Sequence, residues 1–213
     1  LYLLTSWVRE LFPNLAVAAL SHSSDLRQMR QHALEHDRIV AGIRGLDLVF
    51  GLHEGMRDMI ADIYGMPRER VHVLGTGYDA GVFCHEGACA LPMGEDRPPR
   101  ILYAGKIAYA KGVASLMRSL ALLPPELASV EIYLAGGAGD AQEYAAIEAL
   151  AAASGHKVVF LGKVSPSELA SYYRSCDVFV LPSFYEGLPL VVVEAMACGC
   201  KVVVSDLPGV RPW

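Results

Sequence analysis

The chain has 213 residues, of which 53% are hydrophobic and 19% are charged. This composition excludes an intrinsically disordered protein, because disorder requires low hydrophobicity and high charge. Lys and Arg number 18 against 23 Asp and Glu, so the net charge of −5 gives no general attraction to nucleic acid. The longest stretch without a charged residue, Leu11–Ser24, is polar in part and too short to span a bilayer.

The cysteines and the chain ends indicate a cellular context. The five cysteines are odd in number and include no Cys-x-x-Cys pair with matching histidines, so a zinc site is not expected. Reduced, mostly buried thiols predict a cytoplasmic protein. We expect no signal peptide among these residues, because no charged region leads into an apolar stretch at Leu1, and both Leu1 and Trp213 are expected to be cuts within a longer protein.

The first part of the chain predicts a small α/β unit. Short apolar runs alternate there with segments of helical periodicity. The expected elements, in chain order, are a strand at Leu15–Leu20, a helix-like stretch from Asp25 to about Arg38, a strand at Asp47–Leu52, a helix at Glu54–Tyr64 with Gly65 as its C-cap, and a strand at Val71–Leu74.

A change of composition separates this part from the rest. His85–Pro99 combines Pro and Gly residues with charged ones, which is typical of a linker. We therefore predict a partial N-terminal domain over residues 1–90 and a second domain over residues 91–213 that lacks its last elements.

The second domain shows near-continuous apolar runs, which indicate strands that are covered on both faces, as in a parallel sheet. Helix-length segments fill the gaps, so we predict an α/β fold with a doubly wound parallel sheet. The expected strands are Ile101–Ala104, Val130–Ala135, Lys157–Leu161, Asp177–Leu181 and Lys201–Val204. The expected helices are Val113–Leu123, Asp140–Ala153, Ser165–Ser175 and Pro189–Cys198.

Ligands of such sheets bind at the carboxyl ends of the strands, so the loops there are the candidate site. Lys106 and Lys111 flank the first strand–helix turn, beside Gly105. Two cations at a helix entry oppose the helix dipole unless an anion such as phosphate lies between them. The alternative is a pair of solvated surface lysines.

The next two loops have structural interpretations of their own. Gly136, Gly137 and Gly139 weakly resemble a dinucleotide fingerprint, but no acidic residue ends the following strand. The preferred interpretation is that they allow a tight turn and close backbone approach, with Asp140 as a cap at the start of the next helix. Ser165, Pro166 and Glu168 form a capping box. The backbone of Lys163 and Val164 could still meet a flat ligand such as a nucleobase.

The fourth loop is the most informative. Glu186 and Gly187 stand just before a helix whose first residue is expected to be Pro189, so exposed amides could meet an anion. Glu194 lies within that otherwise apolar helix, where a lone carboxylate is costly unless it is bonded. It is either a core residue paired with a local donor or an acceptor for ligand hydroxyls.

Together these residues resemble a known family. Glu186 and Glu194, eight positions apart, match the Glu-x7-Glu motif of retaining glycosyltransferases of the GT-B fold. The surrounding sequence from Ile101 to Gly209 resembles glycosyltransferase family 4, the glycosyl transferases group 1. Ser21–Asp25 is similar to the family's His-x-x-Asp loop, although His22 could equally be a cap or a surface histidine.

The resemblance implies a role for each matching residue. Lys106 and Lys111 would hold the donor diphosphate, although Lys106 stands where the family usually has Arg. Glu186 would bind sugar hydroxyls, supported by the Gly187 and Leu188 amides. The other implied contacts are Glu194 with the nucleotide ribose, the backbone of Lys163–Val164 and of Gly136–Gly139 with the base and phosphates, and His22 with the sugar.

The resemblance thus predicts transfer of a sugar from a nucleotide-diphosphate-sugar donor to a lipid-linked or small-molecule acceptor, without metal or cofactor and with retention of configuration. A nucleotide-sugar epimerase, a glycoside phosphorylase and a binding module without turnover stay as alternatives; a dehydrogenase lacks its ribose-binding acid. We expect weak or no turnover from these residues alone.

Peripheral membrane contact is also open. The basic residues that could form one helix face are Arg27, Arg30, His32, His36 and Arg38. Acidic residues interrupt this face, so a solvated mixed surface is the preferred interpretation.

Overall fold

The computed structural model describes residues 2–31, 34–127 and 129–211, with side chains from Trp7 onward. The chain forms two compact units. The first comprises the residues up to Thr76 together with Glu186–Leu188 and the residues from Pro208 onward, and the second comprises Gly77–Tyr185 and Pro189–Leu207.

The first unit contains a three-stranded parallel sheet in the order β1-β2-β3. Helix α1 packs on α3, and α2 packs on α4, which also contacts β2 and β3. The strands are β1 (Ala18–Leu20), β2 (Leu48–Gly51) and β3 (Val71–Val73). The helices are α1 (Tyr2–Leu11), α2 (Ser24–Gln31), α3 (His36–Arg44) and α4 (Glu54–Tyr64), followed by the short 3-10 helix η1 (Arg68–Arg70).

Helix α4 has the predicted bounds, because both of its ends are set by local residues. The His53 side chain accepts a hydrogen bond from the Met56 amide at the first turn. Gly65 ends the helix in the left-handed conformation, with φ of 57°, which a residue without Cβ adopts readily.

The prediction of one helix-like stretch to Arg38 is wrong. Helix α2 ends at Gln31, and α3 begins at His36 after Glu35, whose φ of 55° is left-handed and incompatible with a continuous helix. The basic residues proposed for one helix face are therefore divided between two helices. His32, which belonged to that face, lies outside the described residues. Helix α1 was not predicted.

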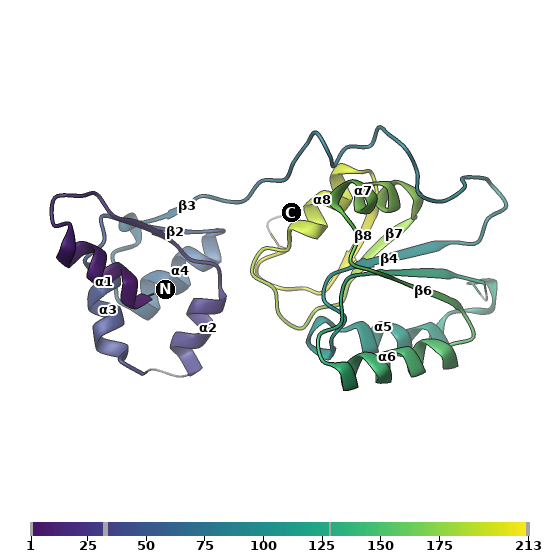
Figure 1. Cartoon of the computed structure of the whole chain (residues 1–213), viewed down its shortest axis with the longest axis horizontal. Helices are drawn as coiled ribbons and strands as arrows, with labels where there is room; N and C mark the ends of the chain where they lie inside the picture. Colours follow the sequence, from purple (N-terminus) through teal and green to yellow (C-terminus); the bar gives the residue numbers. More distant parts are fainter. Residues whose placement is uncertain (1, 32–33, 128, 212–213) are drawn as a thin grey trace. The chain divides into compact units, whose positions relative to one another are not determined.

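The second unit is a five-stranded parallel sheet in the order β6-β5-β4-β7-β8, which confirms the predicted doubly wound α/β fold. Helices α5 and α6 cover one face, and α7 and α8 cover the other (Figure 1). The strands are β4 (Arg100–Ala104), β5 (Glu131–Ala135), β6 (Lys157–Gly162), β7 (Val178–Leu181) and β8 (Lys201–Val204). The helices are α5 (Val113–Ser119), α6 (Ala141–Ala153), α7 (Pro166–Ser175) and α8 (Leu190–Ala197), and the 3-10 helices are η2 (Tyr109–Lys111), η3 (Leu120–Leu122) and η4 (Pro125–Leu127).

The apolar runs form the core of this second unit. Leu102, Ile132 and Phe179, from the three central strands, are fully buried. Tyr173 of α7 packs edge-on against Phe179, with the ring centroids 5.4 Å apart. Full burial of each such aliphatic or aromatic side chain contributes roughly 1.5–3 kcal/mol, so the apolar strands hold the sheet between its helices.

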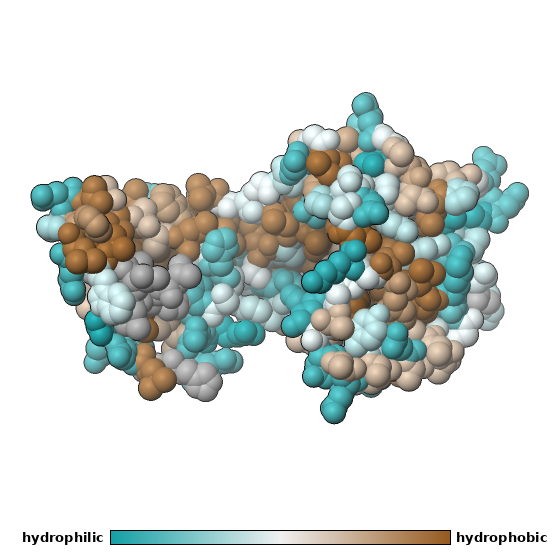
Figure 2. Space-filling model, viewed as in Figure 1, coloured by the Kyte–Doolittle hydropathy of each residue, from teal (hydrophilic) through white to brown (hydrophobic). Residues whose placement is uncertain are grey.

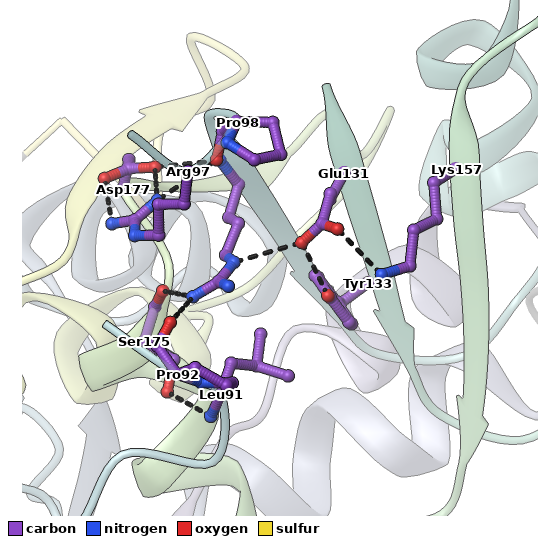
Figure 3. Close-up of polar contacts among 10 residues, drawn as sticks. Leu91, Pro92, Arg97, Pro98, Glu131, Tyr133, Lys157, Ser175 and Asp177 are labelled. Atoms are coloured by element: carbon purple, nitrogen blue, oxygen red, sulfur yellow. Dashed lines mark hydrogen bonds and ion pairs between the residues drawn. The ribbon is translucent and has the colours of Figure 1, made fainter. Parts of the chain in front are cut away.

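A polar network joins the amino ends of the strands (Figure 3). The buried Arg100 side chain contacts Glu131 at 3.1 Å, and Glu131 also accepts from Lys157 at 2.7 Å. Arg97 holds Asp177 through two hydrogen bonds of 2.7 Å. The hydrogen bond from Lys157 is the largest cause that lowers the pKa of Glu131, to about 2, and desolvation of the carboxylate opposes it. These ion pairs fix the edge of the sheet opposite the candidate site.

The segment before β4 lies along the second unit (Figure 1). Arg174 of α7 donates to the carbonyl oxygens of Cys84 and Ala88 at 3.1 and 3.0 Å. The Ala90 amide donates to the Ser171 carbonyl at 3.1 Å. The stretch His85–Pro99, which we predicted as a linker, is thus hydrogen-bonded to helix α7.

Several hydrophobic side chains lie at the surface. Figure 2 shows hydrophobic residues exposed over the first unit. The exposed residues include Leu11 at the end of α1 and Phe12 and Leu15 in the loop that follows it. None of the helices in the described ranges is both long and apolar enough to cross a bilayer.

Candidate functional site

The loops at the carboxyl ends of β4, β5 and β6 are joined by backbone hydrogen bonds. The Ile107 amide donates to Gly137 at 2.9 Å, and the Gly139 amide donates to Ile107 at 3.0 Å. The Gly136 amide donates to Gly162 at 2.7 Å. The glycine loop after β5 is therefore held between the loops after β4 and β6 by hydrogen bonds that extend the pattern of the sheet by one residue pair.

Two glycines of these loops allow backbones to approach closely. Gly136 has φ of 149°, and a Cβ there would overlap the Gly105 carbonyl. Gly112 has φ of 71°, and a Cβ there would overlap the Pro182 carbonyl in the loop after β7. The turn role expected for Gly136 thus has a steric basis, and Gly112 brings the loops after β4 and β7 together.

The lysines lie on these loops. Lys106 is exposed, and its Cε is 3.0 Å from the position that a Cβ on Gly139 would take. The Cε of Lys163 is 3.0 Å from the position that a Cβ on Gly137 would take. The side chains of Lys106 and Lys163 therefore run beside the glycine loop. The Tyr103 hydroxyl donates to the Lys106 carbonyl at 2.7 Å and holds that backbone. Lys111, half-buried, ends η2.

The helix N-termini at this edge differ in their capping. Asp140 accepts from the amides of Gln142 and Glu143 at the start of α6, and Ser165 completes the predicted capping box of α7. Helices α5 and α8 have no side-chain cap. Their N-cap residues are Gly112 and Pro189, neither of which carries a side-chain acceptor.

Pro189 also corrects a prediction. We expected it at the first helical position, but its ψ of 104° is extended, and α8 begins at Leu190. The reason is local: proline fixes φ but not ψ, so a proline with an extended ψ can stand just before the first helical residue. The amides of the first turn are consequently those from Leu190 onward.

Glu194 lies half-buried on α8. Burial raises the pKa of its carboxyl above the usual range. Within the described part of the chain the carboxylate forms no hydrogen bond or ion pair, so the local donor that we considered for it is not present. A carboxylate in this state is able to accept hydrogen bonds from a ligand.

The predicted site residues divide between the two units. The second unit holds Gly105, Lys106, Lys111, Gly136, Gly137, Gly139, Lys163, Val164 and Glu194. Glu186, Gly187 and Leu188 group with the first unit, as does His22, which is exposed after β1. The roles assigned to all of these residues stay predictions.

Sequence reasoning missed the contacts that position the loops. The Glu143 carboxylate accepts from the Tyr109 amide at 2.9 Å and ties α6 to the loop after β4. The Phe184 amide donates to the Ala110 carbonyl at 3.2 Å. No pattern in the sequence signals either contact, because the partners are far apart along the chain. Over the described ranges, no group of three or more His, Cys, Asp or Glu residues is arranged to hold a metal ion.

A doubly wound parallel sheet with lysines and uncapped helices at its carboxyl edge places the chain in the class of Rossmann-like α/β proteins that bind ligands at that edge. Comparison with known families is more specific. The chain belongs to the glycosyl transferases group 1 family, whose model matches residues 94–212.

Curated relatives agree with this assignment. An uncharacterized glycosyltransferase of Methanocaldococcus jannaschii is 33% identical over 76% of this chain and 43% of its own length. A D-inositol 3-phosphate glycosyltransferase of Xylanimonas cellulosilytica is 31% identical over 88% of this chain and 46% of its own length. The chain thus spans less than half the length of these two relatives.

Solved structures show the same fold. HepE of Anabaena, solved in complex with UDP and glucose, matches 99% of this chain and 58% of its own with a TM-score of 0.77 at 20% identity. Sucrose-phosphate synthase of Thermosynechococcus elongatus matches 99% of this chain and 56% of its own with a TM-score of 0.73 at 25% identity. The fold of the chain is therefore that of GT-B glycosyltransferases.

Proposed function

We propose that the chain is the donor-binding part of a retaining, metal-independent glycosyltransferase, which transfers a sugar from a nucleotide diphosphate to an acceptor hydroxyl. The observation that carries the proposal is the carboxyl edge of the second sheet. There Lys106 and Lys163 lie beside a closely packed glycine loop, and helices α5 and α8 begin without side-chain caps.

The chemistry of a diphosphate fits these groups. Uncapped helix N-termini present amides to an anion, and lysine ammonium groups add charge-assisted hydrogen bonds. As the bond between sugar and phosphate breaks, negative charge grows on the leaving diphosphate. Lys106 and Lys111 would stabilise that charge, which is the main requirement of the reaction.

The carboxylates would bind the rest of the donor. Glu194 would accept hydrogen bonds from ribose hydroxyls, and its raised pKa is consistent with a group that lacks a protein partner. Glu186 would bind sugar hydroxyls, supported by the Gly187 and Leu188 amides. Gly136–Gly139 and Lys163–Val164 would line the phosphates and base. His22 would contact the sugar.

The comparisons support a nucleotide-sugar donor. HepE of Anabaena was solved with UDP-glucose as well as with UDP and glucose. We propose the same class of donor here, without naming the sugar or the base. The five unpaired cysteines favour a cytoplasmic location. A cytoplasmic protein of this kind could also contact the membrane peripherally.

Calorimetric titration of the chain with UDP, GDP and ADP in the presence of EDTA tests the proposal. We expect one of the three to bind, and Lys106→Ala and Lys111→Ala each to weaken that binding about tenfold or more, which corresponds to a lost charge-assisted contact of about 1.5–3 kcal/mol. Lys201→Ala is the matched control, because Lys201 is exposed at the amino end of β8.

The outcomes separate the alternatives. If no nucleoside diphosphate binds, or if Lys201→Ala weakens binding as much as the other two variants, the site assignment is wrong. Incubation of the full-length protein with donor alone distinguishes the alternative chemistry, since an epimerase converts the sugar without an acceptor and a transferase does not.

A further inference from the structure

The loop between β4 and α5 carries both Lys106 and Lys111, and a residue from another element holds it at a point between them. The Tyr109 amide, the first of the 3-10 helix η2, donates to the Glu143 carboxylate at 2.9 Å. Glu143 lies half-buried in the first turn of α6. The proposed function gives this carboxylate no role.

The loop has no residue of its own that could make this contact. The first amides of a helical turn lack partners within the turn, and a side chain at the N-cap usually accepts from them. Here the N-cap is Ala108, and the stretch Ile107–Lys111 offers no carboxylate, carboxamide or short hydroxyl side chain. The acceptor therefore comes from α6, whose own start is fixed by the bond from the Glu143 amide to Asp140 at 3.1 Å.

The position of Lys111 depends on this contact. Helix η2 is a single turn of three residues, and so short a helix is not stable by itself. The Lys111 amide donates to the Ala108 carbonyl at 3.2 Å, and the Gly112 amide donates to the Tyr109 carbonyl at 2.9 Å. Both bonds close the turn that Glu143 holds at its first amide, so without Glu143 the turn and the lysine at its end lose their fixed place.

We infer that Glu143 is a positioning residue of the diphosphate site: it caps η2 from α6 and thereby places Lys111. The inference rests on the proposed function, in which Lys111 stabilises the charge of the leaving diphosphate. Glu143 acts through the loop and does not need to touch the donor. It is a second anchor of this loop, in addition to the Tyr103 hydroxyl that holds the Lys106 carbonyl.

The charge of Glu143 and its hydrogen bond have opposite effects on an anion. A carboxylate at the same edge of the sheet repels a bound diphosphate, so the charge alone weakens binding. The hydrogen bond to Tyr109 strengthens binding, because it places Lys111. The two contributions can be separated by variants that remove the charge with or without the acceptor oxygen.

Calorimetric titration with the nucleoside diphosphate that binds the wild type measures both contributions. Glu143→Gln removes the charge but keeps a carbonyl acceptor for the Tyr109 amide, so its affinity should stay within about twofold of the wild type. Glu143→Ala removes both, and it should weaken binding about fivefold or more, the effect of one net hydrogen bond. Glu148→Ala is the matched control, because Glu148 is exposed on the same helix and its loss should leave the affinity unchanged.

A double variant tests whether Glu143 acts through Lys111. In the Lys111→Ala protein, Glu143→Ala should weaken the diphosphate by no more than about twofold, because the effects of residues that share one contact are not additive. Hydrogen exchange followed by NMR gives a second readout that needs no ligand. The Tyr109 amide should exchange faster in Glu143→Ala than in the wild type or in Glu143→Gln. Thermal unfolding checks that each variant is folded at the temperature of the titration.

The inference is overturned if Glu143→Ala binds the diphosphate as tightly as the wild type, or if Glu143→Gln is weakened as much as Glu143→Ala. An undiminished effect in the Lys111→Ala protein, or equal exchange of the Tyr109 amide in all three proteins, also overturns it. If a diphosphate binds and Lys111→Ala weakens it while Glu143→Ala does not, only the positioning inference fails. If no diphosphate binds the wild type, the proposed function fails, and the positioning inference fails with it.

Discussion

Substitution of Gly112 by alanine tests how the loops of the second sheet are built. Gly112 has φ of 71°, a left-handed conformation that costs an L-residue about 1–2 kcal/mol. The new Cβ would also overlap the Pro182 carbonyl. Because that obstacle is backbone, the loop after β7 must move, and overpacking of this kind costs about 1–3 kcal/mol. The two costs together destabilise the fold by about 2–5 kcal/mol.

Gly155 provides a matched control. It is also left-handed, with φ of 75°, but a Cβ there would have no atom within 4 Å. Gly155→Ala should therefore cost only the conformational part, about 1–2 kcal/mol. The difference between the two variants isolates the contact of Gly112 with Pro182.

Urea unfolding followed by circular dichroism measures both free energies, and titration with the nucleoside diphosphate that binds the wild type measures the site. We expect Gly112→Ala to weaken that diphosphate at least tenfold and Gly155→Ala to leave its affinity unchanged. If Gly112→Ala costs no more stability than Gly155→Ala, the close approach of the loops after β4 and β7 is not formed. If it is destabilised but binds the diphosphate normally, these loops do not shape the site.

Three further predictions concern the rest of the second unit. Glu131→Gln should lose about 2 kcal/mol of stability at pH 6 once solvent screening is allowed for. Because the native pKa of Glu131 is depressed to about 2, the stability advantage of the wild type should be complete above about pH 4.5 and should vanish as the pH falls through about 2. A constant difference in urea unfolding between the two proteins across this pH range would contradict the prediction. Ser165→Ala should cost about 1 kcal/mol through loss of the α7 capping box, measured by the same method, whereas Ser167→Ala, next to it, should cost less. Arg174→Ala should release the segment held through Cys84 and Ala88 and speed its cleavage by a glutamate-specific protease at Glu86 or Glu95, which are exposed, an effect that Arg118→Ala on the exposed face of α5 should not reproduce.

The sequence predicted those elements whose signals are local. Strand β8 and helix α4 have the predicted bounds, the first because an apolar run is bounded by polar residues and the second because of its caps. The break between α2 and α3 could not be predicted in this way. It depends on Glu35 in a left-handed conformation, which glutamate does not favour and which packing of the unit must therefore impose.

The candidate site was predicted by position and not by contact. The rule that ligands bind at the carboxyl ends of parallel strands directed attention to Lys106 and the glycine loops. It could not supply the bond from Tyr103 to the Lys106 carbonyl, since a buried tyrosine in a strand looks like any other core residue. Nor could it reveal that Glu194 lacks a local partner, because this depends on every element packed around α8.

The two edges of the second sheet use charge in opposite ways. At the amino edge, Arg100 and Lys157 both pair with the Glu131 carboxylate, so each of these cations has an anionic partner within the protein. At the carboxyl edge, Lys106 and Lys163 form no ion pair within the described part of the chain, and backbone hydrogen bonds between loops replace the salt bridges. Cations left unpaired beside a rigid, glycine-lined surface gain most when an anion binds, and they do not first have to break a bond within the protein. This distribution of charge is why we propose a diphosphate at the carboxyl edge and a purely structural role for the arginines at the other.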